Sequence, residues 1–380
     1  MTKLKFLALA IALLCGATQL SAKDYQVSDF GAKADGITLN TGAIQRAIDA
    51  VNERGGGRLV FGPGKYLTGS IYLKSNVTLH LERGAVLLGS TNPFDYVKDP
   101  YVRWMAMVFA MKQENIGITG KGTIDGQGFK TANNMVQYIQ RGIYEDPLKL
   151  DRPNETNRPE NIYFRECTNV TITGITLRDP ASWNQTYDQC KNVYVDDIYV
   201  EANSYWNNDG IDIDGCRDVI IRNCDVESGD DACCFKGASE RNTERVLIEN
   251  CRLYSCCTAL KVGTDTQGDF RDVLVRNCQI GGVEHDPSGL KHRCSDSGVS
   301  LEMVDGGTLE NFLIENITIA RAWSPFFLRL EDRGRVKPGD PKPPVGTLRR
   351  IAISHVRGGD NGARGSYFIG IPEKAIEDVL

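Results

Sequence analysis

Short stretches of alternating apolar and polar residues recur along most of the chain, and Gly, Asn or Asp residues separate them. A period of two predicts β-strands that bury one face, and the separating residues favour turns. Asn suits such turns because its side chain can bond to nearby backbone or to the same residue in the next repeat. Similar phrases, with Asn, Asp or Arg before a β-branched residue or Phe, open successive strands at Asn76, Asn115, Asn169, Asn192, Asp218, Arg245, Asp272, Asn311 and Arg350.

The spacing of these phrases is nearly constant in the middle of the chain. Steps of 23, 26, 27 and 27 residues separate Val170, Val193, Val219, Val246 and Val273. A fixed period in the twenties, made of short strands and turns, is typical of a solenoid whose coils stack on one another. Leucine-rich repeats share that period, but their recurring leucine framework is absent here. The sequence therefore predicts an all-β fold, a single-stranded parallel β-helix.

One segment near the N-terminus has the period of a helix instead. Asn40-Thr41 is a candidate N-cap, and the i, i+3, i+4, i+7 spacing of one buried face follows at Ala43, Ile44, Ala47, Ile48 and Val51. Three glycines at 55–57 end the pattern. We expect a short helix that caps the open end of the stack and hides its edge from further pairing.

Strands are predicted directly after this helix, at residues 58–61, 66–68, 70–73, 77–81 and 85–88. Three later segments, 127–160, 281–297 and 333–346, break the period because they are polar or rich in proline. We expect long loops there. Residues 376–380 resemble the start of another repeat strand, so we expect the β-helix domain at 23–380 to lack its last coils.

Residues 1–22 have the features of a secretory signal peptide. Two lysines precede an apolar run from Phe6 to Leu14, and Ser21-Ala22 offers a cleavage point. The sequence therefore predicts a periplasmic or secreted protein. A lipoprotein anchor at Cys15 is the less favoured alternative, because Leu14 stands where a small residue is normally expected before a lipidated cysteine. No later segment is long and apolar enough to span a bilayer.

Charge and cysteine content narrow the function classes. The formal net charge is −5, and loss of the signal lysines makes it more negative, which argues against nucleic acid or an anionic membrane as a partner. Eleven of the 12 cysteines follow Cys15. Cys224, Cys251 and Cys278 occupy equivalent places in successive repeats, so we expect stacked free thiols instead of a disulfide framework. The chain contains no Cys-x-x-Cys pair of the kind that binds zinc.

Acidic residues concentrate in two groups, one coil apart. Asp209 and Asp212 precede Asp230 and Asp231, and 21 residues separate Asp209 from Asp230. Crowded carboxylates cannot all ionise normally, so one should keep its proton to higher pH, as the general acid of a glycosidase must. Aspartates that bond to turn backbone and a calcium site are the alternatives. We assign the turn role to the two aspartates at 214 and 225, and catalysis to Asp209, Asp230 and Asp231.

The chain resembles the polygalacturonase family, glycoside hydrolase family 28. The resemblance rests on Phe30-Gly-Ala-Lys-Ala-Asp-Gly36 with its helix, on residues 207–212 (Asn-Asn-Asp-Gly-Ile-Asp), and on Gly229-Asp230-Asp231 followed by Lys236. It covers essentially all of the chain after the predicted signal. It implies a right-handed parallel β-helix that cleaves pectic glycosides with inversion, without a metal or other cofactor.

The resemblance also implies roles for individual residues. Asp230 matches the family's general acid, and Asp209 and Asp231 match the pair that activates water. Inversion would separate acid and base carboxyls by about 6.5–9.5 Å. Asn207 matches the first residue of an Asn-Thr-Asp motif, in which Asn208 replaces the Thr.

Two family motifs are altered. Thr258 stands where a Gly-His-Gly motif has its histidine, and Ser300-Leu301-Glu302 stands where an Arg-Ile-Lys motif grips a galacturonate carboxylate. Glu302 would repel a carboxylate. We therefore expect a rhamnogalacturonan or a branched pectic glycan, polymer or oligosaccharide, to be a better substrate than homogalacturonan.

Further candidates for substrate binding lie near the acidic cluster. Asp212 belongs to the cluster itself, and Lys236 and Lys261 occupy similar places one coil apart and could supply positive charge; a solvated head is the alternative for Lys261. Trp183 and Trp206 could stack on sugar faces or simply pack.

Two other functions remain open at this point, and we expect a monomer in each case. A pectate-lyase-like enzyme would use calcium and a basic residue, but no Arg base is evident beside the acids. A non-enzymatic β-helix that binds glycans is the third hypothesis.

Overall fold

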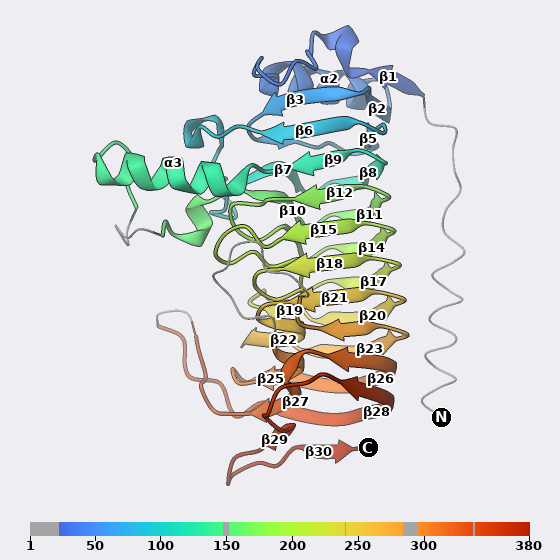
Figure 1. Ribbon diagram of the computed structural model, residues 1–380, viewed down its shortest axis with the longest axis vertical. Coiled ribbons are helices and arrows are strands. Elements are labelled where there is room, and N and C mark those ends of the chain that lie inside the picture. The colour runs from blue at the N-terminus through green and yellow to red at the C-terminus, as the bar shows by residue number, and fades with distance from the viewer. Residues whose placement is uncertain (1–22, 147–151, 240, 284–294, 337–338) are drawn as a thin grey trace.

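The computed structural model describes residues 23–146, 152–239, 241–283, 295–336 and 339–380. The predicted signal peptide at 1–22 lies outside the described residues, as do parts of the predicted loops at 127–160, 281–297 and 333–346. The described chain forms a right-handed parallel β-helix whose coils stack along one axis (Figure 1). The predicted fold class is therefore confirmed.

The strands of the described residues form two parallel sheets. The larger sheet has 20 strands: β1 (Asp24–Gln26), β2 (Gly57–Phe61), β3 (Gly64–Thr68), β5 (Val77–Leu81), β6 (Ala85–Gly89), β8 (Glu114–Gly120), β9 (Thr123–Asp125), β11 (Thr168–Thr173), β12 (Thr176–Arg178), β14 (Lys191–Asp196), β15 (Tyr199–Ala202), β17 (Arg217–Arg222), β18 (Asp225–Ser228), β20 (Thr243–Glu249), β21 (Arg252–Ser255), β23 (Phe270–Arg276), β24 (Gln279–Gly281), β26 (Thr308–Ala320), β28 (Thr347–Gly359) and β30 (Glu377–Val379). The smaller sheet has 10 strands: β4 (Ile71–Tyr72), β7 (Ala106–Met111), β10 (Glu160–Arg165), β13 (Gln185–Asp188), β16 (Ile211–Asp214), β19 (Cys233–Gly237), β22 (Thr258–Thr266), β25 (Ser295–Met303), β27 (Ala322–Leu330) and β29 (Tyr367–Ile369).

The N-terminal end of the stack is covered by helix α2 (Thr41–Glu53), as predicted (Figure 1). Its buried residues are Ile44, Ala47, Ile48 and Val51. Asn40 occupies the N-cap position, but its side chain does not cap the helix. The Asn40 amide instead accepts from Lys33 N at 2.8 Å and donates to the Lys33 and Thr38 carbonyls, so it fixes the preceding loop.

A second helix, α3 (Gly128–Gln140), projects from the side of the stack (Figure 1). The prediction of a loop through 127–160 was wrong here, because this polar segment buries a narrow face made of Gly128, Thr131, Ala132 and Met135. Short 3₁₀ helices lie at η1 (Val27–Phe30), η2 (Pro93–Asp95) and η3 (Glu155–Asn157). The described part of residues 127–160 thus contains helix α3 and the 3₁₀ helix η3, and the chain returns to the stack at β10.

Each predicted strand-opening position has the backbone conformation of a tight turn. Residues 76, 115, 169, 192, 218, 245, 272, 311 and 350 all have positive φ, between 54° and 63°. Several amide side chains bond from coil to coil: Asn115 Nδ2 donates to Asn76 Oδ1, Asn169 to Asn115 and Asn192 to Asn169, each at 2.8 Å. The left-handed region suits Asn and Asp, which explains their place in the repeat.

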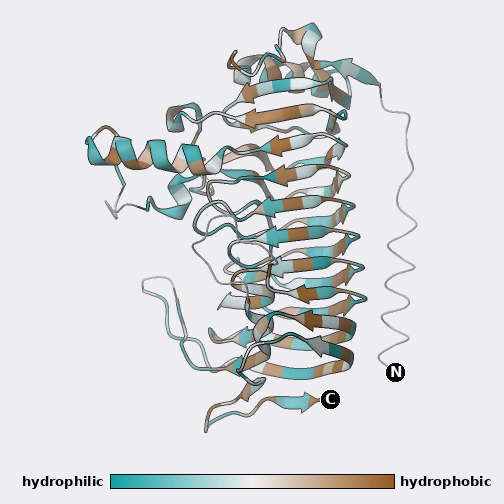
Figure 2. Cartoon of the chain, viewed as in Figure 1, coloured by the Kyte–Doolittle hydropathy of each residue, from teal (hydrophilic) through white to brown (hydrophobic). Residues whose placement is uncertain are grey.

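Apolar side chains of every coil fill the interior of the stack, so that apolar and polar residues alternate along the strands (Figure 2). The cysteines at 224, 251 and 278 are free and buried, and they directly precede residues that pair in register on β18, β21 and β24. The predicted stack of free thiols is thus confirmed.

Candidate active site

Successive coils of the smaller sheet bring the predicted catalytic carboxylates together. Asp209 lies just before β16, and Asp230 and Asp231 lie just before β19, which pairs with β16 in parallel. Gly210 N donates to Asp231 O at 2.8 Å, and Asp230 N donates to Asn208 O at 3.2 Å. Because paired strands lie about 4.8 Å apart, this register places Asp209 beside Asp231.

Burial perturbs the carboxylates of this cluster. Asp209, Asp212 and Asp231 are 2%, 0% and 2% exposed, whereas Asp230 is half-buried. Burial raises the pKa of Asp212 to about 7 and raises the pKa of Asp209 well above its usual value, while the charge of Lys236 opposes both shifts. The expectation that a crowded carboxyl keeps its proton to higher pH is confirmed in direction.

Two lysines form ion pairs with these carboxylates. Lys236 Nζ lies 3.1 Å from Asp209 Oδ2 and 3.5 Å from Asp212 Oδ1, and Lys261 Nζ lies 3.0 Å from Asp231 Oδ2. The alternative of a solvated head for Lys261 is wrong, since its side chain is only 16% exposed. The two lysines are also not at equivalent positions, because Lys261 pairs in register with residue 234, and β19 and β22 shift register after residue 235.

The aromatic candidates contact cations on the protein. Lys236 Nζ lies 4.5 Å from the centroid of the Trp183 ring, which in turn lies 4.6 Å from the Trp104 ring. Trp206 is 42% exposed, and the Arg152 guanidinium lies 5.2 Å from its ring. Trp183 therefore contacts the cluster through Lys236, whereas Trp206 is exposed and its ring faces Arg152.

Arg158, which the sequence analysis missed, anchors the turn before Asp209. This fully buried side chain donates to the carbonyls of Pro153, Ala181 and Trp206 at 2.9, 2.6 and 2.7 Å, and to Asn207 Oδ1 at 2.7 Å. Asn207 thus has a structural partner, and its φ of 55° marks a tight turn. No sequence signal identifies Arg158, because its partners come from three separate segments.

Asn208, which replaces the family's Thr, also holds this turn. It is fully buried, accepts from the backbone N–H of residue 205 at 2.6 Å, and donates to the carbonyls of residues 180 and 182 at 3.0 and 2.8 Å. Asn208, directly before Asp209, is therefore held by four hydrogen bonds. Three are those of its side chain, and the fourth runs from Asp230 N to its backbone carbonyl.

Glu160 is a second residue that the sequence analysis missed. It opens β10, is fully buried, and accepts a hydrogen bond from Thr186 Oγ at 2.6 Å. Burial raises its pKa well above the usual value, and Asp212 and Asp209 add to the rise. Glu160 was not identified as a candidate because it lies at the end of the loop predicted for residues 127–160.

The two altered family motifs lie on the coils that follow. Thr258 opens β22 and is 5% exposed, and its carbonyl accepts from Ala232 N at 2.9 Å. Glu302, on β25, lies 3.1 Å from Arg329 and accepts from Ser300 Oγ at 3.0 Å. Glu302 therefore has a cationic partner on the next coil, which the sequence analysis did not identify.

The spacing of acid and base differs from the expectation. An oxygen of Asp230, an oxygen of Asp231 and the sulfur of Cys257 all lie within 4.8 Å of one another. This is shorter than the about 6.5–9.5 Å expected between the carboxyls of an inverting pair. This single oxygen–oxygen contact between Asp230 and Asp231 does not itself indicate inversion.

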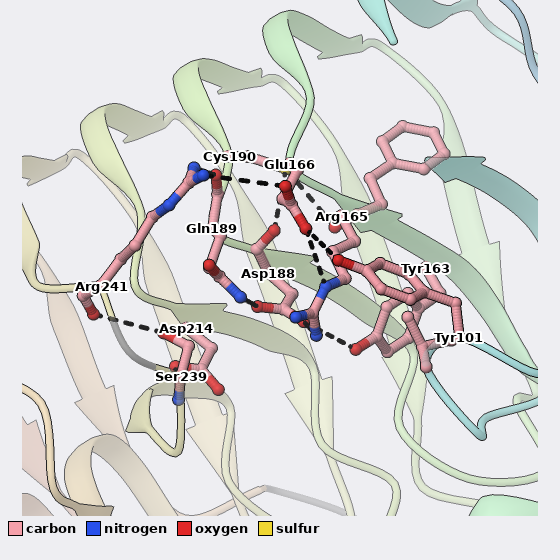
Figure 3. A network of polar contacts seen from close by, with 12 residues as sticks. Tyr101, Tyr163, Arg165, Glu166, Asp188, Gln189, Cys190, Asp214, Ser239 and Arg241 are labelled. Carbon is pink, nitrogen blue, oxygen red and sulfur yellow. Dashed lines mark hydrogen bonds and ion pairs between the residues drawn. The ribbon is translucent and has the colours of Figure 1, made fainter. Parts of the chain in front are cut away.

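The two aspartates assigned to turns make different contacts. Asp214 is half-buried and accepts from Ser239 N at 3.1 Å, but Ser239 lies 25 residues further along the chain, so this contact is not the local turn bond that was assigned. Asp225 instead forms a 2.6 Å ion pair with Arg252 on the larger sheet, so the turn role was wrong for it. Asp214 adjoins a polar network on the coils that precede the cluster, in which Arg165 Nη1 lies 2.6 Å from Asp188 (Figure 3).

The contacts of Lys236 bear on the calcium and lyase hypotheses. Its ammonium contacts both Asp209 and Asp212, and so takes the place that a cation would need between them. Burial alone would lower the pKa of Lys236, but the carboxylates outweigh it and raise the pKa above its usual value. An ammonium held by two carboxylates is not the free base that a lyase would need.

Comparisons with known proteins agree with this geometry. The family model of Glycosyl hydrolases family 28 matches residues 59–318. An exo-poly-alpha-D-galacturonosidase of Dickeya chrysanthemi is 28% identical over 306 residues, which cover 67% of this chain and 50% of the relative. The chain thus spans about half the length of this curated relative.

Two solved structures share the fold. The hyperthermoactive exopolygalacturonase of Thermotoga maritima has a TM-score of 0.76 at 21% identity, over 98% of this chain and 89% of that one. The family 28 exopolygalacturonase of Yersinia enterocolitica has a TM-score of 0.75 at 23% identity, over 94% and 70%. No helix in the described part of the chain is long and apolar enough to cross a bilayer.

Proposed function

Because the chain belongs to glycosyl hydrolase family 28, we propose that it hydrolyses glycosidic bonds of a pectic polysaccharide or oligosaccharide. The observation that carries the proposal is the difference in partners within the carboxylate cluster. Asp209 and Asp231 each form an ion pair with a lysine, whereas Asp230 has no ion pair in the part of the chain that the structure describes. The three carboxylates thus differ in their electrostatic surroundings, which suit different catalytic roles.

The roles follow from these partners. A base that takes a proton from water must be ionised. Burial raises the pKa of Asp209, and the ammonium of Lys236 opposes that rise, while Lys261 pairs with Asp231, so these two are the carboxylates with a cation that supports ionisation, and we assign them to the activation of water. Asp230 is half-buried and has no countercharge among the described residues, so we assign it the donation of a proton to the leaving oxygen. Family membership supports inversion of the anomeric centre.

The coil that carries Glu302 suggests which sugar is accepted. Arg329 lies 3.1 Å from Glu302 and 3.2 Å from Glu331, so two carboxylates surround one guanidinium. The net charge of this group is negative and disfavours a sugar carboxylate. A neutral sugar there is consistent with rhamnogalacturonan or a branched pectin, and less so with homogalacturonan.

Export and assembly are part of the same proposal. The features of residues 1–22 support a periplasmic or secreted protein, where pectic glycans are met outside the cytoplasm. The protein acts as a monomer, without a metal or other cofactor in the reaction.

The test compares Asp230→Asn with Asp225→Asn on rhamnogalacturonan oligosaccharides. Asp225 is a matched control, because its ion pair with Arg252 lies on the other sheet. Asp230→Asn should lower kcat by at least about 10³-fold, whereas Asp225→Asn should leave it within about twofold. Equal activity of both variants would exclude Asp230 as the acid and favour a non-enzymatic glycan-binding protein with a contaminating activity.

A further inference from the structure

A thiol lies beside two of the proposed catalytic carboxylates. Cys257 comes from the coil after Asp230 and Asp231, and its sulfur and one oxygen of each carboxylate lie within 4.8 Å of one another. The cluster therefore combines one soft donor with two hard donors, which the proposed hydrolysis does not require.

Asp231 has an oxygen that is free to bind a ligand. Its Oδ2 pairs with Lys261 at 3.0 Å, but its buried Oδ1 has no hydrogen-bond partner among the described residues. A buried polar atom without a partner costs free energy, about 1–3 kcal/mol and more when it is charged. A cation at this oxygen would remove that cost.

We propose that Asp230, Asp231 and Cys257 bind Zn²⁺, or a divalent ion with similar preferences, and that this ion inhibits the enzyme. Zinc takes Cys sulfur at about 2.3 Å and carboxylate oxygen at about 2.0–2.2 Å, and sites with three protein ligands leave a fourth position for water. The three donors, already within 4.8 Å of one another, would need to move closer to reach these distances. Calcium and magnesium require oxygen ligands, so the sulfur selects against them.

Charges around the site act in both directions. The carboxylates of Asp209 and Asp212 attract a cation, whereas the ammonium groups of Lys236 and Lys261 repel it. Binding converts the thiol to a thiolate, and its proton leaves to solvent. The bound ion then occupies the acid and one base together, so substrate cannot be protonated. This inhibitory effect rests on the proposed function, but binding itself does not.

Cobalt binding tests the site on the full chain, without any substrate. Co²⁺ added to the metal-free protein should produce the near-ultraviolet charge-transfer band of a thiolate ligand, and Zn²⁺ should abolish it by displacement. Cys257→Ser should remove the band and weaken Zn²⁺ binding at least tenfold. Asp230→Asn, at a half-buried position that a folded protein tolerates, should weaken Zn²⁺ binding similarly.

Cys256→Ser is the matched control, because within the described residues Cys256 lies outside this group of donors. It should keep both the band and the affinity. The proposal is overturned if the unmodified protein gives no band, if Cys257→Ser retains it, or if Cys256→Ser loses it equally. A protein that binds Co²⁺ as described but cleaves no pectic glycan would contradict the proposed function and leave this site intact.

Discussion

Two lysines decide which of the clustered carboxylates has a countercharge. Lys236 pairs with Asp209 and Lys261 with Asp231, although all of these side chains are largely buried. Removing one partner of such a pair leaves a buried charge without compensation. The lysines therefore act through the bases, and their substitution should change the pH dependence of the reaction as well as its rate.

Lys236→Met should move the acidic limb of the kcat/KM profile to higher pH. Burial already raises the pKa of Asp209, and Lys236 is the group that limits the rise, so its loss raises this pKa further. Activity at neutral pH should fall about 10–100-fold. Lys121→Met is the control, because the Lys121–Asp197 pair is more than half exposed on both sides. An unshifted pH profile would show that Lys236 does not influence the ionisation of the catalytic base.

Asp214 should make the protein less stable as pH rises. Burial raises its pKa to about 6 from 3.8, with nearby Asp188 adding to the rise (Figure 3). Its contribution to stability is therefore complete below about pH 4 and is lost as pH rises through 6. Asp214→Asn keeps the acceptor for Ser239 N and should reduce the fall in unfolding free energy between pH 4 and 7 by about 2–3 kcal/mol.

Asp35→Asn is the control with the opposite sign. Hydrogen bonds from the Thr38 and Ile37 N–H groups lower the pKa of Asp35 to about 2. Its contribution is present above the unfolded value and is lost as pH falls through 2. The pH dependence of the free energy of unfolding, measured in urea, should therefore differ between this variant and the unmodified protein only below about pH 4. A pH dependence of Asp214→Asn identical to that of the unmodified protein would contradict the effect of burial.

Residues whose roles depend on local phrases were predictable, and residues whose partners lie on other coils were not. Asp209, Asp230 and Asp231 stand in short motifs one coil apart, so their meeting followed from the repeat. The partner of Glu302 is Arg329, its register partner on β27, but Arg329 stands in no motif that marked it in the sequence. Arg158 was hidden because its partners come from three separate segments.

At the scale of elements, Arg158 connects the α3 insertion to the catalytic coil. Its guanidinium donates one hydrogen bond to Pro153, in the segment that follows α3, and three to the later coils at residues 181, 206 and 207. The insertion itself was read as a loop because α3 is mostly polar and its buried face is small. A cation that satisfies four acceptors in a fixed fork cannot be replaced by a lysine.

Arg158→Ala should lower the free energy of unfolding by about 3–5 kcal/mol, because it leaves buried acceptors without donors. Arg158→Lys should recover only a small part of this loss. Arg152→Ala, which removes an exposed guanidinium next to Trp206, should cost less than about 1 kcal/mol. Equal stability of Arg158→Ala and Arg152→Ala in urea unfolding would show that the buried contacts do not fix the turn.

At the scale of the whole molecule, the repeated left-handed turns let coils of unequal length stack in register. The strand-opening residues were recognisable in the sequence, and all of them have positive φ. The period, the core and the N-terminal cap were therefore predictable from pattern alone. The handedness came from the family resemblance, because alternation does not fix it.

Asn192→Ala should destabilise the stack by about 1–2 kcal/mol, because Ala at a φ of 54° is strained and the hydrogen bond to Asn169 is lost. Asn192→Gly loses the same hydrogen bond but accepts this φ, so it should cost less. Thermal unfolding of both variants gives the comparison. A Gly variant no more stable than the Ala variant would contradict the view that backbone strain at this φ makes up part of the cost.

NMR analysis of the products formed from matched rhamnogalacturonan and homogalacturonan oligosaccharides tests the proposed hydrolysis and its sugar preference together. The negative charge of the Glu302 group predicts that rhamnogalacturonan is cleaved at least about tenfold faster, and membership of family 28 predicts inverted configuration at the new reducing end. Rapid release of galacturonic acid from homogalacturonan would contradict the account.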